Sequence, residues 1–86
     1  MKLKEGFVAY NTEDTHILVP TGSQTFKGVV RSNATAGFIM DLLKEETDKE
    51  SVVRAMMEKY GIERILAEKD AEKVFSQLRA IDALEE

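Results

Sequence analysis

Short apolar runs separated by turn-forming residues occupy the first third of the chain. Phe7 to Tyr10 lies between Gly6 and a polar cluster, and Thr15 to Val19 is a β-branched run that ends at Pro20. A third run, Thr25 to Arg31, alternates loosely between two faces. This pattern predicts three short strands joined by tight turns, an antiparallel meander whose apolar face needs a cover.

The remaining two thirds of the chain carry apolar residues at helical spacing. Ser32 and Asn33 are suitable N-caps for a first helix, and Thr47 with Glu50 three residues later forms a capping-box pattern for a second. Gly61 is placed to end the second helix in a left-handed conformation. The third helix is expected to begin between residues 62 and 68, and the apolar helix positions are Phe38, Ile39, Leu42, Leu43, Val52, Val53, Met56, Met57, Tyr60, Ala67, Ala71, Val74, Phe75, Leu78 and Ile81. Strands followed by helices predict an α+β fold, and without a linker or repeat we expect a single domain over residues 1–86.

The composition narrows the function classes. The chain has 86 residues, a formal net charge of −4 and no cysteine, which removes disulfides, thiolate metal sites and cysteine nucleophiles. No apolar run approaches the roughly 20 residues that a membrane-spanning helix needs. We therefore expect a soluble, cytoplasmic protein that does not associate with membranes.

Residues able to carry catalysis are scarce. His16 is the one histidine, it lies in a strand-like run, and no metal-ligand spacing surrounds it, so it is expected on the solvated face or at the rim of the sheet. Most carboxylates lie beside lysine or arginine on helix faces, and Gly22 and Gly28 do not form a phosphate-binding loop. The sequence predicts a protein that is not an enzyme and that binds no metal or cofactor.

The order of motifs resembles a known family. Residues 28–43, GVVRSNATAGFIMDLL, look like a strand that passes through an Asn-containing turn into a helix, and Thr47, Tyr60-Gly61 and the pattern Asp70-x-x-x-Val74-Phe75-x-x-Leu78 follow. This order is similar to that of the coenzyme PQQ synthesis protein D (PqqD) family, over about Phe7 to Leu84. The chain departs from the family in two places. Ser32 stands where the family often has leucine, which would leave a smaller plug between strand and helix, and Ile81 to Leu84 lacks the common glycine.

The resemblance implies a winged helix-turn-helix domain that recognises a peptide and has no catalytic activity. Such a domain captures the leader segment of a ribosomally made precursor peptide as an extra strand, on the edge of the third strand and against the third helix. It then presents the precursor to a modifying enzyme, commonly a radical SAM enzyme, and we expect a monomer or weak dimer. The expected peptide-binding residues are Phe26, Lys27, Gly28, Val29, Val30 and Arg31 for the backbone ladder, with Ala71, Val74, Phe75 and Leu78 for an apolar wall that would otherwise be core.

Some interpretations stay open at this point. Lys27 and Arg31 would favour an acidic leader, or would only discourage edge-to-edge aggregation. Gly28 fits a bulge, a close backbone approach or a packing glycine. A winged helix also serves DNA-binding regulators, but the third helix alternates basic and acidic residues, which favours peptide over nucleic acid. A structural subunit of a larger assembly, without a free strand edge, is the third alternative.

Overall fold

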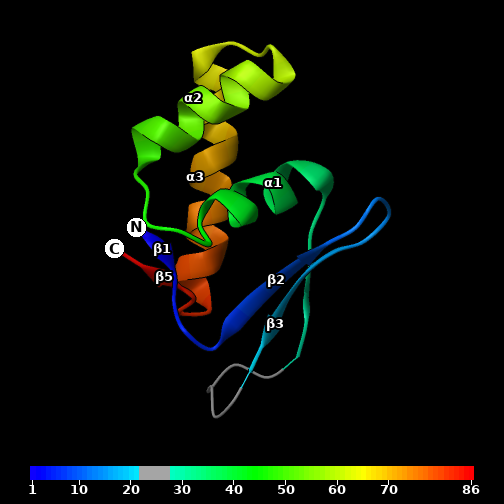
Figure 1. Cartoon of the computed structure of the whole chain (residues 1–86). Coiled ribbons are helices and arrows are strands. Elements are labelled where there is room, and N and C mark those ends of the chain that lie inside the picture. The colour runs from blue at the N-terminus through cyan, green and yellow to red at the C-terminus, as the bar shows by residue number, and fades with distance from the viewer. Residues whose placement is uncertain (22–27) are drawn as a thin grey trace.

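The computed structural model describes residues 1–21 and 28–86. Its elements run β1 (Lys2–Leu3), β2 (Phe7–Asn11), β3 (His16–Pro20), β4 (Val30–Arg31), α1 (Ala34–Leu42), α2 (Lys49–Tyr60), α3 (Arg64–Ala80) and β5 (Leu84–Glu85) (Figure 1). The strands β2, β3 and β4 form an antiparallel sheet in that order, and β1 pairs with β5 apart from it. The predicted α+β fold is confirmed, with a three-stranded antiparallel sheet followed by three helices.

The sheet turns one face toward the helices. In β2, Phe7 and Ala9 are buried, whereas Val8 and Tyr10 between them are exposed, as the alternation of a half-buried strand requires. α1 contacts β2 and β3, and α3 packs against α1 and α2. The core formed in this way contains Leu3, Phe7, Ala9, Leu18, Ala36, Ile39, Met40, Leu43, Val52, Val53, Met56, Ala67, Ala71, Val74, Phe75, Leu78, Ala83 and Leu84.

Two helix ends follow the sequence pattern, and one does not. Asn33 caps α1 by accepting the N–H of Ala36 at 2.8 Å, and Gly61 ends α2 in the left-handed region at φ 63°. The predicted capping box at Thr47 is wrong. Asp48 is the N-cap of α2, and its carboxylate accepts the N–H of Ser51 at 2.7 Å. The helix starts one residue later than the pattern suggested, so a charged acceptor, the Asp48 carboxylate, caps its first turn.

The third strand is shorter than predicted. We expected it to cover Thr25 to Arg31, but within the described part of that run only Val30–Arg31 pairs with β3. Gly28 has φ 120°, outside the β region for an L residue, so it is not part of the strand. Nothing lies within 4 Å of where its Cβ would be, so conformation rather than close packing explains this glycine.

β1 and β5 were not predicted from the sequence. They pair Lys2 with Glu85 and Leu3 with Leu84, and so bring the two ends of the described chain together. The turn that makes this possible follows α3, where Asp82 adopts φ 57°. The Asp82 N–H donates to the carbonyl of Arg79, and the next N–H donates to that of Leu78. This is a Schellman motif in which aspartate takes the position that glycine usually holds.

Candidate functional site

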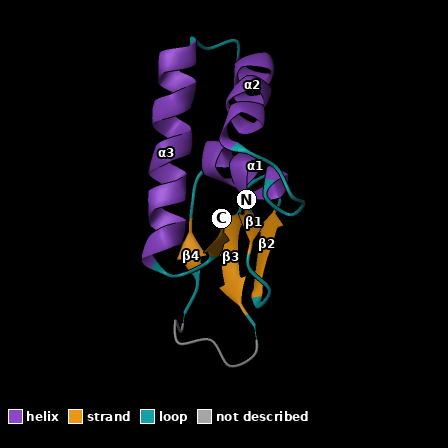
Figure 2. Ribbon diagram, turned by 90° about the vertical axis from the view of Figure 1, so that its left-hand side faces the viewer, coloured by secondary structure: helices purple, strands orange, loops and turns teal. Residues whose placement is uncertain are grey.

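One edge of the three-stranded sheet is directed toward α3. Among residues 1–21 and 28–86, β4 pairs only with β3, and Figure 2 shows α3 beyond its other side. The N–H of Ser32 donates to the carbonyl of His16 at 2.8 Å. Because antiparallel residues alternate in the direction of their backbone groups, those of Val30 face β3 and those of Arg31 face the opposite edge. Val29 lies between Gly28 and β4, just outside the paired residues.

The side chains of β4 divide between the two faces of the sheet. Val30 is partly buried and packs against the core. Arg31 is exposed, and Val29 is 53% exposed although it is a large apolar residue. A strand added beside β4 would therefore meet an apolar side chain and a cation on the outer face of the sheet.

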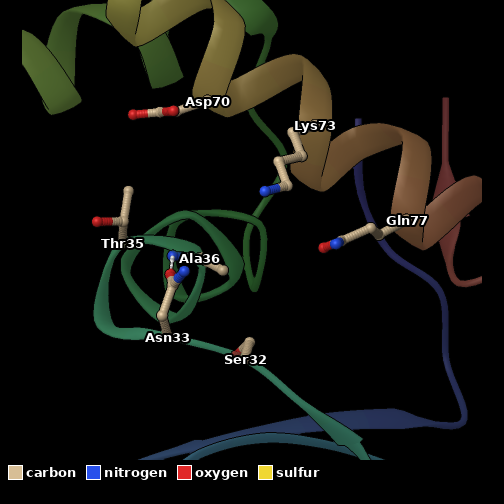
Figure 3. Close-up of a pocket in the computed structure, with 7 residues that line it drawn as sticks. All are labelled: Ser32, Asn33, Thr35, Ala36, Asp70, Lys73 and Gln77. Atoms are coloured by element: carbon tan, nitrogen blue, oxygen red, sulfur yellow. Dashed lines mark hydrogen bonds between the residues drawn. The ribbon is translucent and has the colours of Figure 1, made fainter.

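A polar pocket lies where β4 leads into α1. Its volume is about 170 Å³, and it is lined by Ser32 and Asn33 from the turn, by Thr35 and Ala36 from the start of α1, and by Asp70, Lys73 and Gln77 from α3. Figure 3 shows Lys73 and Gln77 extending from α3 toward the turn. The space between the end of β4 and α3 thus presents amine, amide, hydroxyl and carboxylate groups.

The apolar residues of α3 that the sequence suggested as a peptide-binding wall lie in the core. Ala71, Val74, Phe75 and Leu78 are each at most 4% exposed. Of the expected ladder residues, Phe26 and Lys27 lie outside the described residues, whereas Gly28 to Arg31 lie at or next to β4.

The pocket-lining residues of α3 were missed in the sequence analysis. They are Asp70, Lys73 and Gln77, whose spacing of i, i+3 and i+7 places them on one stripe of the helix. That spacing was the available signal, but it does not distinguish a stripe beside a strand edge from any other solvated stripe.

The two arginines of α3 have acidic partners. Arg64 donates to both oxygens of Glu50, at 3.0 and 2.8 Å, and Arg79 pairs with Glu72 and Glu86. The hydrogen bond from Arg64, followed by that from Arg54, lowers the pKa of Glu50 from its usual 4.5 to about 2. Among the residues that the structure describes, Lys73 forms no ion pair, which leaves its ammonium group available to a ligand.

His16 has a structural partner. Its Nδ1 lies 2.9 Å from Oδ1 of Asn11, at the start of β3, and the ring is partly buried at the sheet rim. Across residues 1–21 and 28–86, no group of three or more His, Cys, Asp or Glu side chains is arranged to hold a metal ion. The expectation that no metal or cofactor binds stays a prediction. In the same ranges, no helix is both long and apolar enough to span a bilayer.

Comparison with known proteins gives a family and a similar fold. The family model described as "Coenzyme PQQ synthesis protein D (PqqD)" matches residues 8–84. A solved structure entitled "TbiB1 in Complex with the TbiA(beta) Leader Peptide" is 24% identical, with a TM-score of 0.82, and the alignment covers 99% of this chain and 95% of that one. No curated protein sequence matches the chain significantly. Because the family model covers most of the sequence, the chain belongs to the PqqD family.

Proposed function

We propose that this protein binds the leader segment of a ribosomally made precursor peptide as an additional strand on the edge of β4. It performs no chemistry itself and presents the precursor to a modifying enzyme, for which a radical SAM enzyme is our expectation. Membership of the PqqD family and the similarity to a protein solved with a leader peptide support this function. The observation that carries it is the edge of β4, whose outward backbone groups face α3.

The edge has the properties that strand addition needs. An extended peptide gains affinity from main-chain hydrogen bonds and specificity from alternate side chains that enter neighbouring pockets. Arg31 and Val29 would supply the main-chain groups, and the pocket beside Ser32 would take a side chain. The buried residues Ala71, Val74, Phe75 and Leu78 then act as the rigid apolar backing that holds α3 at its distance from β4.

The ion pairs on α3 favour a peptide over DNA. Affinity for DNA depends mainly on lysine and arginine that neutralise phosphates. Here Arg64 and Arg79 are already paired with carboxylates, and the net charge of the chain is −4. We expect duplex DNA at physiological salt to bind only in the weak non-specific range, about 10⁻⁴ M or poorer.

The function can be tested without knowing the natural precursor. A library of random linear peptides displayed on their messenger RNA is selected against the immobilised whole chain, and the best binder is synthesised; we call it the selected peptide. It is then titrated into ¹⁵N-labelled protein, and the amide shifts are mapped. We expect the largest shifts at Val29 to Ser32 and at Asp70 to Gln77.

Three outcomes would contradict the proposal. Failure to enrich any peptide would argue against peptide binding itself. Shifts confined to β2 or α2, with Gly28 to Arg31 unmoved, would show that the peptide uses another edge. A sequence-specific DNA complex at nanomolar protein would instead favour a transcriptional regulator.

A further inference from the structure

The pocket beside Ser32 lies where an inward-facing side chain of an added strand would end. Ser32 follows Val30 by two residues, so the alternation of the strand directs both side chains to the helix side of the sheet. A residue directly opposite Ser32 on an added strand would have its Cβ about 5 Å from that of Ser32. The Ser32 hydroxyl donates to the carbonyl of His16 at 3.3 Å, so this short side chain is held toward β3 and leaves the space open.

The pocket is large enough for one side chain. Its volume is about 170 Å³. A cavity of roughly 150 Å³ in a protein core is known to accept a benzene molecule. Unlike such a cavity, this pocket is lined mainly by polar groups, so its occupant should be polar as well.

The order of charges along α3 indicates which polar group fits. A side chain that enters from the end of β4 meets Gln77 and Lys73 first (Figure 3). Asp70 lies three residues before Lys73 and seven before Gln77, about 4.5 and 10 Å along the helix axis, on the side of Thr35. The near end of the pocket therefore offers an amide and an ammonium donor, and within the described ranges neither Lys73 nor Asp70 has an ion-pair partner.

From this arrangement we infer that the pocket selects an acidic residue at one position of the bound peptide. The carboxylate of an Asp or Glu would accept hydrogen bonds from the Lys73 ammonium group and from the Gln77 amide. The inference rests on the proposed function and adds to it the chemical class of one leader residue. A hydrogen bond in which donor and acceptor are charged is roughly twice as strong as a neutral one.

A charge reversal tests this selectivity. The random peptide library is selected in parallel on the wild-type chain, on Lys73→Glu and on Lys69→Glu. Lys69 is the matched control because it is also exposed on α3 but does not line the pocket. We expect acidic residues at one position of the wild-type and Lys69→Glu pools, and Lys or Arg at that position of the Lys73→Glu pool. Exchanging the acid for lysine in the selected peptide should weaken wild-type binding at least tenfold and strengthen binding to Lys73→Glu.

A variant without a charge change gives an independent check. Ser32→Leu should fill the space and reduce the preference for the acid at this position, as measured with the selected peptide and its Glu-to-Gln analogue. If peptides bind at the β4 edge but the wild-type and Lys73→Glu pools show the same residue there, the inference is wrong and the proposed function stands. If no peptide is enriched on the wild-type chain, both are wrong.

Discussion

Gly37 fixes how closely α1 approaches the sheet. The Asn11 amide donates to the Gly37 carbonyl at 3.2 Å, and Oδ1 of Asn11 bonds to the ring of His16. A Cβ on Gly37 would overlap Oδ1 of Asn11 and lie 2.7 Å from Nδ1 of His16. The absence of a side chain at this position therefore allows a polar pair to fit between the helix and strands β2 and β3.

Gly37→Ala should lower the free energy of unfolding by about 1–3 kcal/mol, because the added methyl group forces Asn11 and His16 to move. Alanine is otherwise the better helix former, so a loss of stability is specific to this clash. Urea denaturation measures the change. In an Asn11→Ala background the penalty should be smaller, since the nearest obstructing atoms are gone. An equal penalty in both backgrounds would contradict the steric explanation.

At the residue scale, the sequence was informative about burial and much less about the site. Val74, Phe75 and Leu78 were recognised as one apolar stripe, and all three are buried. The same apolarity made them candidates for a peptide-binding wall, whereas Lys73 and Gln77 line the pocket instead. The spacing of hydrophobic residues identifies which side chains are buried on folding. It does not identify which polar stripe of a helix lies beside a strand edge, because that depends on how α3 is placed against β4.

At the scale of elements, the edge of β4 gives a direct test of the backbone ladder. Val29→Pro removes the N–H of the residue that leads into β4, which an added strand would use, so it should weaken binding of the selected peptide about tenfold, roughly 1.4 kcal/mol. Val29→Ala keeps the N–H and shortens the side chain, so it should bind with nearly unchanged affinity. Fluorescence anisotropy of the labelled peptide measures both. Equal losses for the two variants would assign the effect to the side chain and not to the ladder.

The packing of α2 against α3 carries a pH dependence through Glu50. Arg64 and Arg54 lower the pKa of its carboxyl from 4.5 to about 2, so its contribution to stability is present above pH 4.5. That contribution is lost as the pH falls from 4.5 toward 2. We expect Glu50→Gln to reduce Tm at neutral pH and to show a shallower fall in Tm between pH 4.5 and 2 than the wild type.

Glu45→Gln is the matched control for this experiment. Glu45 is also exposed, and in the described part of the chain it forms no ion pair. Its substitution should leave the acid limb of the Tm profile parallel to that of the wild type. Parallel profiles for Glu50→Gln would show that the pairs with Arg54 and Arg64 do not couple to folding.

Element boundaries were predicted where a single residue type decides them. Asn33 begins α1 and Gly61 ends α2 as expected, because capping and a left-handed conformation are local requirements. β1 and β5 were missed, since two-residue strands have no periodicity and their partners lie at opposite ends of the chain. The turn that joins α3 to β5 was not predicted. Its positive φ belongs to Asp82, whereas sequence patterns associate a positive φ with glycine.

At the scale of the whole molecule, the pairing of β1 with β5 closes the core. Leu84 is buried, whereas its neighbour Glu85 is exposed. Leu84→Ala should lower the free energy of unfolding by about 2–4 kcal/mol, the usual cost of truncating a buried leucine. Glu85→Ala should change it by no more than about 0.5 kcal/mol. Urea denaturation measures the free energy of unfolding of both variants. Similarly small changes would indicate that β1 and β5 do not contribute to the stability of the core.

The same pairing determines how this protein could be joined to another. Figure 1 places both ends on one side of the molecule and the turn from β4 to α1 on the other, so a partner fused at either end leaves the β4 edge uncovered. A flexible linker spans 5–6 Å times the square root of its length, so crossing the 29 Å intermediate dimension requires roughly 30 residues. An enzyme tethered by such a linker would meet the captured peptide at a local concentration near the millimolar range, without any contact between the two proteins.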